Sequence, residues 1–228
     1  MSKGFDHYYP NQELALCLLL EEATGVTTLG WEKAAHLFTL HGVPTWVSLA
    51  NGLTVLDFVA ATPDYIDCPA LDTVDLDFTD GDFSGLAWVY GTLNGREVFI
   101  KGTVGTNNGW GFSLNVNNQM VFFTVQAGAA SQTTTGALIT LNAWHCVGFS
   151  RTGAVARIYN DGADATAVSQ AHIDPVSAAA NAFTIGSTAA GGAGWWDGRM
   201  WRPRIWSKLV PAAVFKTIFE NERHLFGV

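Results

Sequence analysis

Four tryptophans lie in glycine-rich or polar segments, where an aromatic ring could meet a ligand. Trp31 is one of them, and the others stand in residues 107–110 and 192–197. An aromatic ring beside amide or carboxylate groups suits a saccharide, because the C–H face of a sugar stacks on the ring while its hydroxyls form hydrogen bonds. The predicted saccharide site comprises Asn107, Asn108, Trp110, Trp195, Trp196 and Asp197. The alternative is that these rings close the ends of the fold or pack against a neighbouring subunit.

The acidic residues form no catalytic pattern. Retaining hydrolysis of a glycosidic bond needs two carboxyl groups about 5 to 5.5 Å apart. Asp75 and Asp77 have the spacing of one strand face, but they stand in an Asp-rich, turn-rich stretch where acids are usually solvated. The seven glutamates follow no such pattern: Glu13, Glu21, Glu22, Glu32, Glu97, Glu220 and Glu222. Ser84 lacks the Gly-x-Ser-x-Gly elbow and the six histidines are scattered, so we expect no catalytic residues and no enzymatic activity.

Short apolar runs bounded by Gly, Asn, Asp or Pro are the elements that must position any site. In the C-terminal half they cover residues 143–150, 155–162, 182–187 and 196–206, and in the N-terminal half residues 14–24, 52–58, 64–67 and 82–90. Residues 111–116 and 120–125 alternate on either side of Asn117 and Asn118, which predicts a hairpin with a tight turn. Further turns are expected at residues 151–153 and 160–162. This spacing of strands and turns is typical of an antiparallel two-sheet sandwich.

One helix is expected near the C-terminus, over residues 211–220. Pro211 suits its first turn, and Val214, Phe215, Ile218 and Phe219 fall on one face. The helix should therefore pack on the sandwich. Trp88, Trp144 and Trp206 lie within strand patterns and are expected in the core.

Composition favours one folded domain that does not bind nucleic acid. The chain has 228 residues, of which 48% are hydrophobic and 14% charged, and no linker interrupts it. Its net charge of −8 disfavours contact with phosphate backbones, which requires a Lys/Arg surface. We therefore expect a short N-terminal extension, residues 1–11, followed by a single domain at residues 12–228.

Residues 14–20 form an apolar run that does not read as a signal peptide. Acidic residues flank it, no basic lead precedes it, and seven residues are too few to span a bilayer as a helix. The run is interpreted as a first buried strand, and no membrane insertion is expected. Cys17, Cys68 and Cys146 form no Cys-x-x-Cys pair, so neither a zinc motif nor a redox motif is present.

The order of these segments resembles the laminin-G-like, concanavalin-A-like superfamily. A Trp-opening strand at residues 143–150 precedes a strand ending Tyr-x-Asp-Gly at 159–162, then Ile-Gly at 185–186, then a closing strand ending Arg-Ile-Trp at 204–206. The resemblance covers about residues 12–226 and implies a two-sheet antiparallel jelly roll with a short C-terminal helix. The glucanase branch carries Glu-x-Asp-x-x-Glu on one strand, and this chain has no such string.

The resemblance also implies a possible calcium site at the rim of the sandwich. Many relatives bind Ca²⁺ through Asp side chains and loop carbonyls, which are hard oxygen ligands. Seven aspartates fall between residues 64 and 82, and the candidate ligands are Asp64, Asp67 and Asp161. The chain departs from the family pattern at Thr28–Lys33 and at Trp201, which stands where the family often has an acid.

By analogy, the resemblance places the chain among phage virion proteins. The expected role is a non-enzymatic capsid decoration, spike or fibre module on the virion surface, with glycan binding as a further expectation. Other virion subunits or further copies of the chain would be its partners, and residues 5–10, with Tyr8 and Tyr9, would dock to one. The alternatives are a secreted or cell-surface, calcium-dependent lectin of cellular origin and, less favoured, a glycoside hydrolase.

Overall fold

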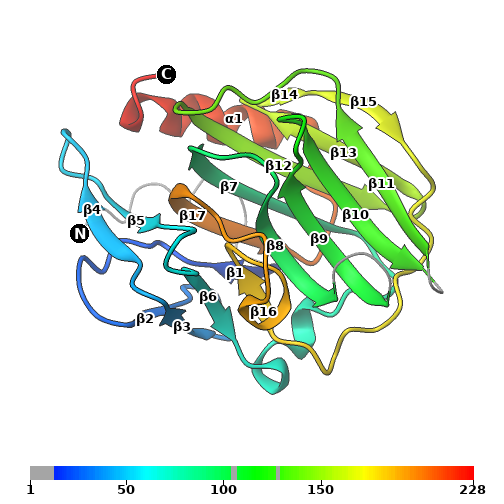
Figure 1. The fold of residues 1–228 in the computed structure, drawn as a ribbon. Coiled ribbons are helices and arrows are strands. Elements are labelled where there is room, and N and C mark those ends of the chain that lie inside the picture. The colour runs from blue at the N-terminus through cyan, green and yellow to red at the C-terminus, as the bar shows by residue number, and fades with distance from the viewer. Residues whose placement is uncertain (1–12, 104–106, 127–128) are drawn as a thin grey trace.

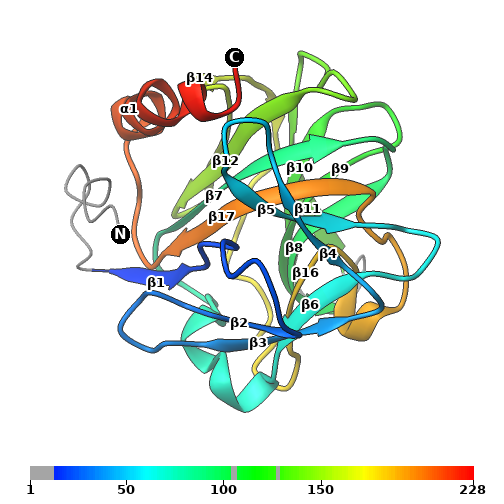
Figure 2. The same cartoon turned by 90° about the vertical axis from the view of Figure 1, so that its left-hand side faces the viewer.

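The protein folds as two antiparallel β-sheets packed face to face, with a helix on the outer side of one of them (Figures 1 and 2). The structure, a computed structural model, describes residues 13–103, 107–126 and 129–228. Within these residues one sheet has eight strands and the other nine. The expected jelly-roll sandwich with a C-terminal helix is therefore confirmed. The predicted docking segment at residues 5–10 lies outside the described residues.

The two sheets are named here by their strand number. In spatial order, the eight-stranded sheet contains β14 (Ala163–Asp164), β13 (Val155–Asn160), β12 (Trp144–Thr152), β7 (Phe83–Gly91), β17 (Gly198–Trp206), β5 (Thr54–Phe58) and β4 (Thr45–Ser48), with β1 (Leu14–Cys17) paired to β17. The nine-stranded sheet contains β15 (Thr166–Ser169), β11 (Ala129–Thr135), β10 (Met120–Gln126), β9 (Asn108–Leu114), β8 (Arg96–Thr103), β16 (Phe183–Ile185), β6 (Tyr65–Cys68), β3 (Leu37–His41) and β2 (Thr27–Leu29). Short 3₁₀ helices occur at η2 (Ala70–Asp72), η3 (Val74–Leu76), η4 (Ala189–Gly191) and η5 (Arg223–Leu225).

Most predicted strands and turns form where the apolar runs place them. Asn118 turns the β9–β10 hairpin at φ +59°, and Asp161 and Gly162 turn β13 into β14 at φ +49° and +76°. Asn, Asp and Gly tolerate this left-handed region better than other residues, which explains the turns. The first strand is shorter than the predicted 14–24 and ends at Cys17, because the chain turns aside at Leu20 with φ +56°.

Two apolar layers hold the fold together. The space between the sheets is filled mainly by aliphatic and phenylalanine side chains such as Phe149 and Phe122, whose rings stack at 4.4 Å. A second layer lies between the eight-stranded sheet and α1 (Ala212–Glu222), whose Phe215 stacks on Tyr159 at 4.0 Å. The predicted helix and its packing are thus confirmed. In the described part of the chain, no helix has the length and apolar character needed to cross a membrane.

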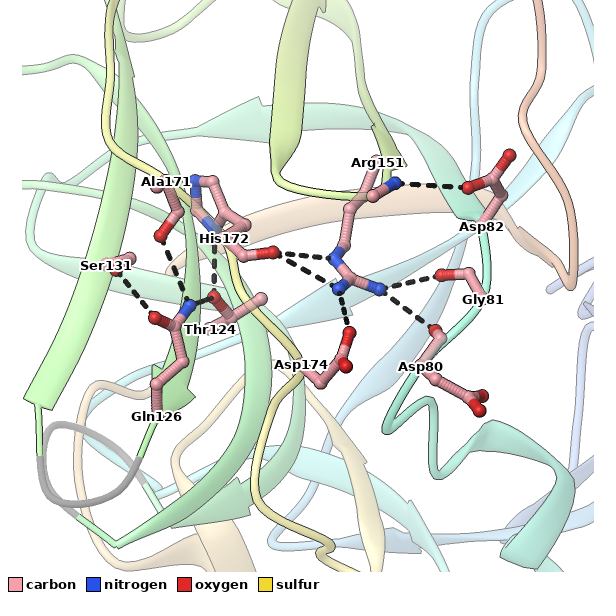
Figure 3. Close-up of polar contacts among 11 residues, drawn as sticks. Asp80, Gly81, Asp82, Thr124, Gln126, Ser131, Arg151, Ala171, His172 and Asp174 are labelled. Carbon is pink, nitrogen blue, oxygen red and sulfur yellow. Dashed lines mark hydrogen bonds and ion pairs between the residues drawn. The ribbon is translucent and has the colours of Figure 1, made fainter.

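A long connection, residues 170–182, crosses the edge of the sandwich between β15 and β16, and we call it the strap. Arg151 on β12 is buried and ties the strap to the start of β7 (Figure 3). Its guanidinium donates to the carbonyls of His172, Asp80 and Gly81 and to the carboxylate of Asp174, at 2.6–3.3 Å. One buried cation therefore joins three segments that are distant in sequence.

The imidazole of His172 is the second anchor of the strap. It is fully buried, and its Nδ1 and Nε2 share hydrogen bonds with the hydroxyls of Thr124 and Thr133 at 2.9 and 2.8 Å. Burial, and then the nearby charge of Arg151, lowers the pKa of His172 to about 4. The ring is therefore neutral in the folded protein at physiological pH.

The lowered pKa of His172 predicts loss of stability in mild acid. Between pH 6.5 and about 4 the unfolded chain binds a proton at this residue and the folded chain does not, so the free energy of unfolding falls as pH falls. The full effect is about 3 kcal/mol and is absent above pH 6.5. Urea denaturation of the wild type and of His172→Gln between pH 7 and 4.5 measures the difference in slope. Parallel pH profiles would show that His172 does not titrate in this way.

Candidate functional site

Two of the predicted stacking tryptophans are part of the core. Trp110 is buried against Phe83 and Phe149 and donates its indole N–H to the carbonyl of Leu76 at 3.0 Å. Trp196 is fully buried in the same inter-sheet layer. The prediction that these two rings are exposed for a saccharide is therefore wrong. Trp110 lies on strand β9 and Trp196 in the loop before β17, and both side chains point inward because burial removes their large apolar surface from water.

The polar members of the predicted saccharide site bind the protein itself. Asn108 accepts from the N–H of Thr103 and donates to Asn181 and to the carbonyl of Ser177, so its amide joins the end of β8 to the strap. Asp197 accepts from the N–H of Ala60 at 2.9 Å and from the hydroxyl of Thr92. These side chains fix loops and do not face a common ligand.

The remaining predicted side chains lie at separate places on the surface. Asn107 is exposed just before β9. Trp195 is half-buried in the loop between β16 and β17, and its indole N–H donates to the carbonyl of Gly191. Trp31 is 65% exposed just after β2, at the far edge of the nine-stranded sheet. None of the predicted residues lines the pocket described below, although Trp195 follows Gly194, whose carbonyl accepts from the N–H of Glu97.

The three candidate calcium ligands are likewise not brought together. The buried carboxylate of Asp64 accepts from the N–H groups of Val43 and Val59 at 2.8 and 2.9 Å, and from the hydroxyl of Thr62. Asp161 lies in the other sheet, after β13, and accepts from the N–H of Cys146 at 2.9 Å. Asp67 pairs with the imidazole of His41, at 2.8 Å. Within the described residues, no three His, Cys, Asp or Glu side chains cluster as a metal site.

A pocket on the outer face of the nine-stranded sheet offers a different site. It has a volume of about 180 Å³ and spans β8 to β11. Its lining residues are Glu97, Ser113, Asn115, Val121, Phe123, Ala130 and Gln132. Val121 pairs with Ser113, and Phe123 pairs with Gln132, so the pocket is set by strand register. The side chains of Ser113 and Gln132 make no hydrogen bond to other described residues and are available to a ligand.

A glycine on β9 makes room for the aromatic floor of this pocket. Gly111 pairs with Phe123, and a Cβ at position 111 would lie 2.4 Å from Cζ of that ring and 2.6 Å from Cδ1 of Ile100. Phe123, Ile100 and Val125 form a small apolar cluster on this outer face. Because Gly111 has no side chain, the ring of Phe123 can pack directly against β9.

A β-bulge on β8 turns Glu97 toward the pocket. Glu97 pairs with Ser113 while Phe99 pairs with Phe112, so the register shifts by one residue between them. Val98 and Phe99 consequently both enter the core, and Glu97 remains on the outer face. Bulges commonly re-aim a side chain next to a functional site. Residues 97–100 read Glu-Val-Phe-Ile without alternation, so this orientation could not be predicted from the sequence.

The carboxyl of Glu97 is buried, and no positive charge among the lining residues of the pocket compensates it. Its Oε2 is buried and has no hydrogen-bond partner in the described part of the chain. Burial raises the pKa of Glu97 to about 7. Among the residues that line the pocket, no Lys, Arg or His balances its charge. An acid with a raised pKa in a concave pocket, beside a phenyl ring and a hydroxyl, is an arrangement common at functional sites.

Sequence and structure comparisons place this architecture in a known family. Residues 62–213, two thirds of the chain, match the profile of the concanavalin A-like lectin/glucanases superfamily. The chain belongs to this superfamily. No curated protein matches the sequence of this superfamily member.

Solved structures with the same fold include bacterial toxin binding domains. The binding domain of Paraclostridial Mosquitocidal Protein 1 superposes with a TM-score of 0.73 at 12% identity, covering 92% of this chain and 52% of that one. The botulinum neurotoxin serotype C1 binding domain gives 0.68 at 12% identity with the same coverage. The binding domain of botulinum neurotoxin DC in complex with SialylT gives 0.68 at 13%, covering 93% of this chain and 52% of that one. This superfamily member thus spans about half the length of these domains, and the likeness shows a shared fold.

Proposed function

We propose that this chain is a non-enzymatic recognition module that binds a saccharide in the pocket between β8 and β11. The observation that carries the proposal is the juxtaposition of the Glu97 carboxyl, the Phe123 ring and the free side chains of Ser113 and Gln132. A sugar can stack a C–H face on the ring and bond its hydroxyls to the polar groups. The volume of about 180 Å³ is below the roughly 300–1,000 Å³ of pockets for larger ligands and suits one sugar ring.

The same pocket does not support glycoside hydrolysis. Both common mechanisms need a second carboxyl group, at about 5–5.5 Å for retention or 6.5–9.5 Å for inversion. Glu97 is the only acid among the residues that line the pocket. Its raised pKa would suit a general acid, but no other lining residue carries a carboxyl group to serve as the nucleophile or base of these mechanisms. Membership of a superfamily that includes lectins, and a fold shared with toxin binding domains, are compatible with binding without catalysis.

A glycan array probed with the purified chain, followed by calorimetric titration of the best ligand, tests the proposed function. We expect Ala130→Phe, which fills the pocket from β11, to weaken binding at least tenfold. Trp31→Ala is the matched control, because Trp31 is exposed at the far edge of the same sheet, and it should bind as the wild type does. Loss of binding in Trp31→Ala with full binding in Ala130→Phe would move the site to the β2 edge.

We propose a virion surface as the biological setting, on the strength of the sequence resemblance. This setting predicts assembly with other copies of the chain, whereas a cellular lectin could act as a monomer. Light scattering after size exclusion, with and without a chelator, separates the two and also tests calcium. A stable oligomer that ignores the chelator supports the virion setting, and a monomer that loses thermal stability on chelation supports the calcium-dependent lectin.

A further inference from the structure

We propose that the pocket selects an amino sugar carrying a protonated amine and rejects acidic sugars. This inference rests on the proposed function and adds the chemical class of its ligand. It is carried by the position of the Glu97 carboxyl, which reaches the pocket with no cationic partner of its own. A ligand ammonium would supply the missing charge.

The loop between β16 and β17 packs against Glu97 and restricts its side chain. The N–H of Glu97 donates to the carbonyl of Gly194 at 3.0 Å, and the loop between β16 and β17 lies against the Glu97 side chain. A Cβ at position 194 would lie 2.9 Å from Cγ of Glu97, at φ +62°. Glycine at 194 is therefore what allows this close approach. Because this packing restricts the Glu97 side chain, less side-chain entropy is lost when a ligand binds its carboxyl.

The surroundings of Glu97 favour a cation over an anion or a neutral group. Burial alone raises the pKa of Glu97 to about 7, so ionisation near neutral pH is unfavourable until a positive charge approaches. Among the charged residues of the adjoining segments, Arg96 forms no ion pair with Glu97, and Asp197 is bonded to Ala60 and Thr92. An ammonium group beside Glu97 would favour the ionised carboxylate and lower its pKa.

The Phe123 ring and the nearby polar groups complete the specificity. The aromatic face attracts an ammonium as well as the C–H groups of a sugar ring. The hydroxyl of Ser113, opposite Glu97 in the strand register, and the amide of Gln132 can bond sugar hydroxyls. A carboxylated sugar would place a second negative charge next to Glu97 and be repelled. The pocket would therefore prefer a positively charged sugar, whereas a site for acidic sugars prefers a negatively charged one.

Isothermal titration with a panel of hexosamines, the matching neutral hexoses, their N-acetylated forms and N-acetylneuraminic acid tests the inference at pH 7. We expect galactosamine or glucosamine to bind roughly tenfold to a hundredfold more tightly than its neutral counterpart, the range of a charge-assisted hydrogen bond. N-acetylneuraminic acid should bind most weakly. In Glu97→Gln the amino-sugar preference should vanish, while affinity for the neutral hexose changes less than about twofold.

The titrations distinguish failure of the amino-sugar preference from failure of the saccharide pocket itself. Binding of all sugars without an amine preference, abolished in Ala130→Phe, would overturn the inference and leave the saccharide pocket standing. Equal absence of binding in the wild type and in Ala130→Phe would overturn both. Carboxyl ¹³C NMR of Glu97 supplies a readout independent of affinity, because galactosamine should shift its titration from about 7 to lower pH. An unchanged titration under saturating galactosamine would refute direct contact.

Discussion

Replacing Glu222 with alanine is expected to lower the free energy of unfolding by about 3–5 kcal/mol, because it breaks a buried charge pair. Glu222, at the end of α1, is 4% exposed and accepts from the indole N–H of Trp88 at 2.8 Å. Its other oxygen accepts from Arg204 on β17 and lies 3.5 Å from Arg202. Without the carboxylate, the indole loses its acceptor and the buried Arg204 guanidinium loses its counter-charge.

Equilibrium urea denaturation measures this loss, and the same helix provides the control. Glu220 is half-exposed and pairs with Arg223 at 3.5 Å, so Glu220→Ala should change stability by less than about 1 kcal/mol. Hydrogen exchange should show that in Glu222→Ala the amides of α1 lose protection before those of the two sheets do. The reason is that the pair of Glu222 and Arg204 joins the helix to the eight-stranded sheet. Equal stabilities of the two variants would mean that Glu222 is not buried against Arg204.

Replacing Arg151 with alanine is expected to destabilise the protein by at least about 3 kcal/mol, through several hydrogen bonds to one buried charge. Three backbone carbonyls, at His172, Asp80 and Gly81, lose their donor (Figure 3). The strap should then open locally, and limited proteolysis should cut within residues 170–182. Lysine at this position should restore less than half of the stability, because one ammonium cannot reach acceptors on both sides as the planar guanidinium does.

Arg157 is the matched control for Arg151. It lies on the adjacent strand β13, is half-exposed and stands 3.8 Å from Asp164. Surface pairs of this kind contribute about 0–1 kcal/mol, so Arg157→Ala should resemble the wild type in stability and in protease resistance. If Arg151→Ala resists protease as well as Arg157→Ala does, the strap is held by its other contacts, such as the hydrogen bonds of His172.

The superfamily fold could be predicted because its determinants are local and ordered along the chain. Alternation around Asn118 specifies the β9–β10 hairpin, and Asp161 with Gly162 specifies the turn after β13. The stripe that includes Phe215 and Ile218 specifies the docking face of α1. Each of these signals acts within a few residues, so periodicity and turn chemistry are sufficient to find it.

Whether each tryptophan side chain points into the core or toward solvent depends on the tertiary structure. Trp110 and Trp196 stand in segments as polar as that of Trp31, yet the first two are buried and the third is exposed. A glycine-rich, polar context predicts neither that Trp110 lies on strand β9 nor which way the side chains of such a segment point. The direction of each side chain depends on which face of its segment covers the apolar interior, and that is known only when the two sheets are packed.

The sequence by itself therefore determined the sandwich, its hairpins, its helix and the lack of a motif for paired catalytic carboxylates. Only the tertiary structure placed Glu97 beside Ser113 and Phe123, since a one-residue bulge on β8 and strand pairing across β8 to β11 bring them together. Register shifts of this kind leave the composition of a strand unchanged but reverse the face on which a side chain lies. For that reason the fold could be predicted from short-range patterns, while the candidate site depends on contacts between strands.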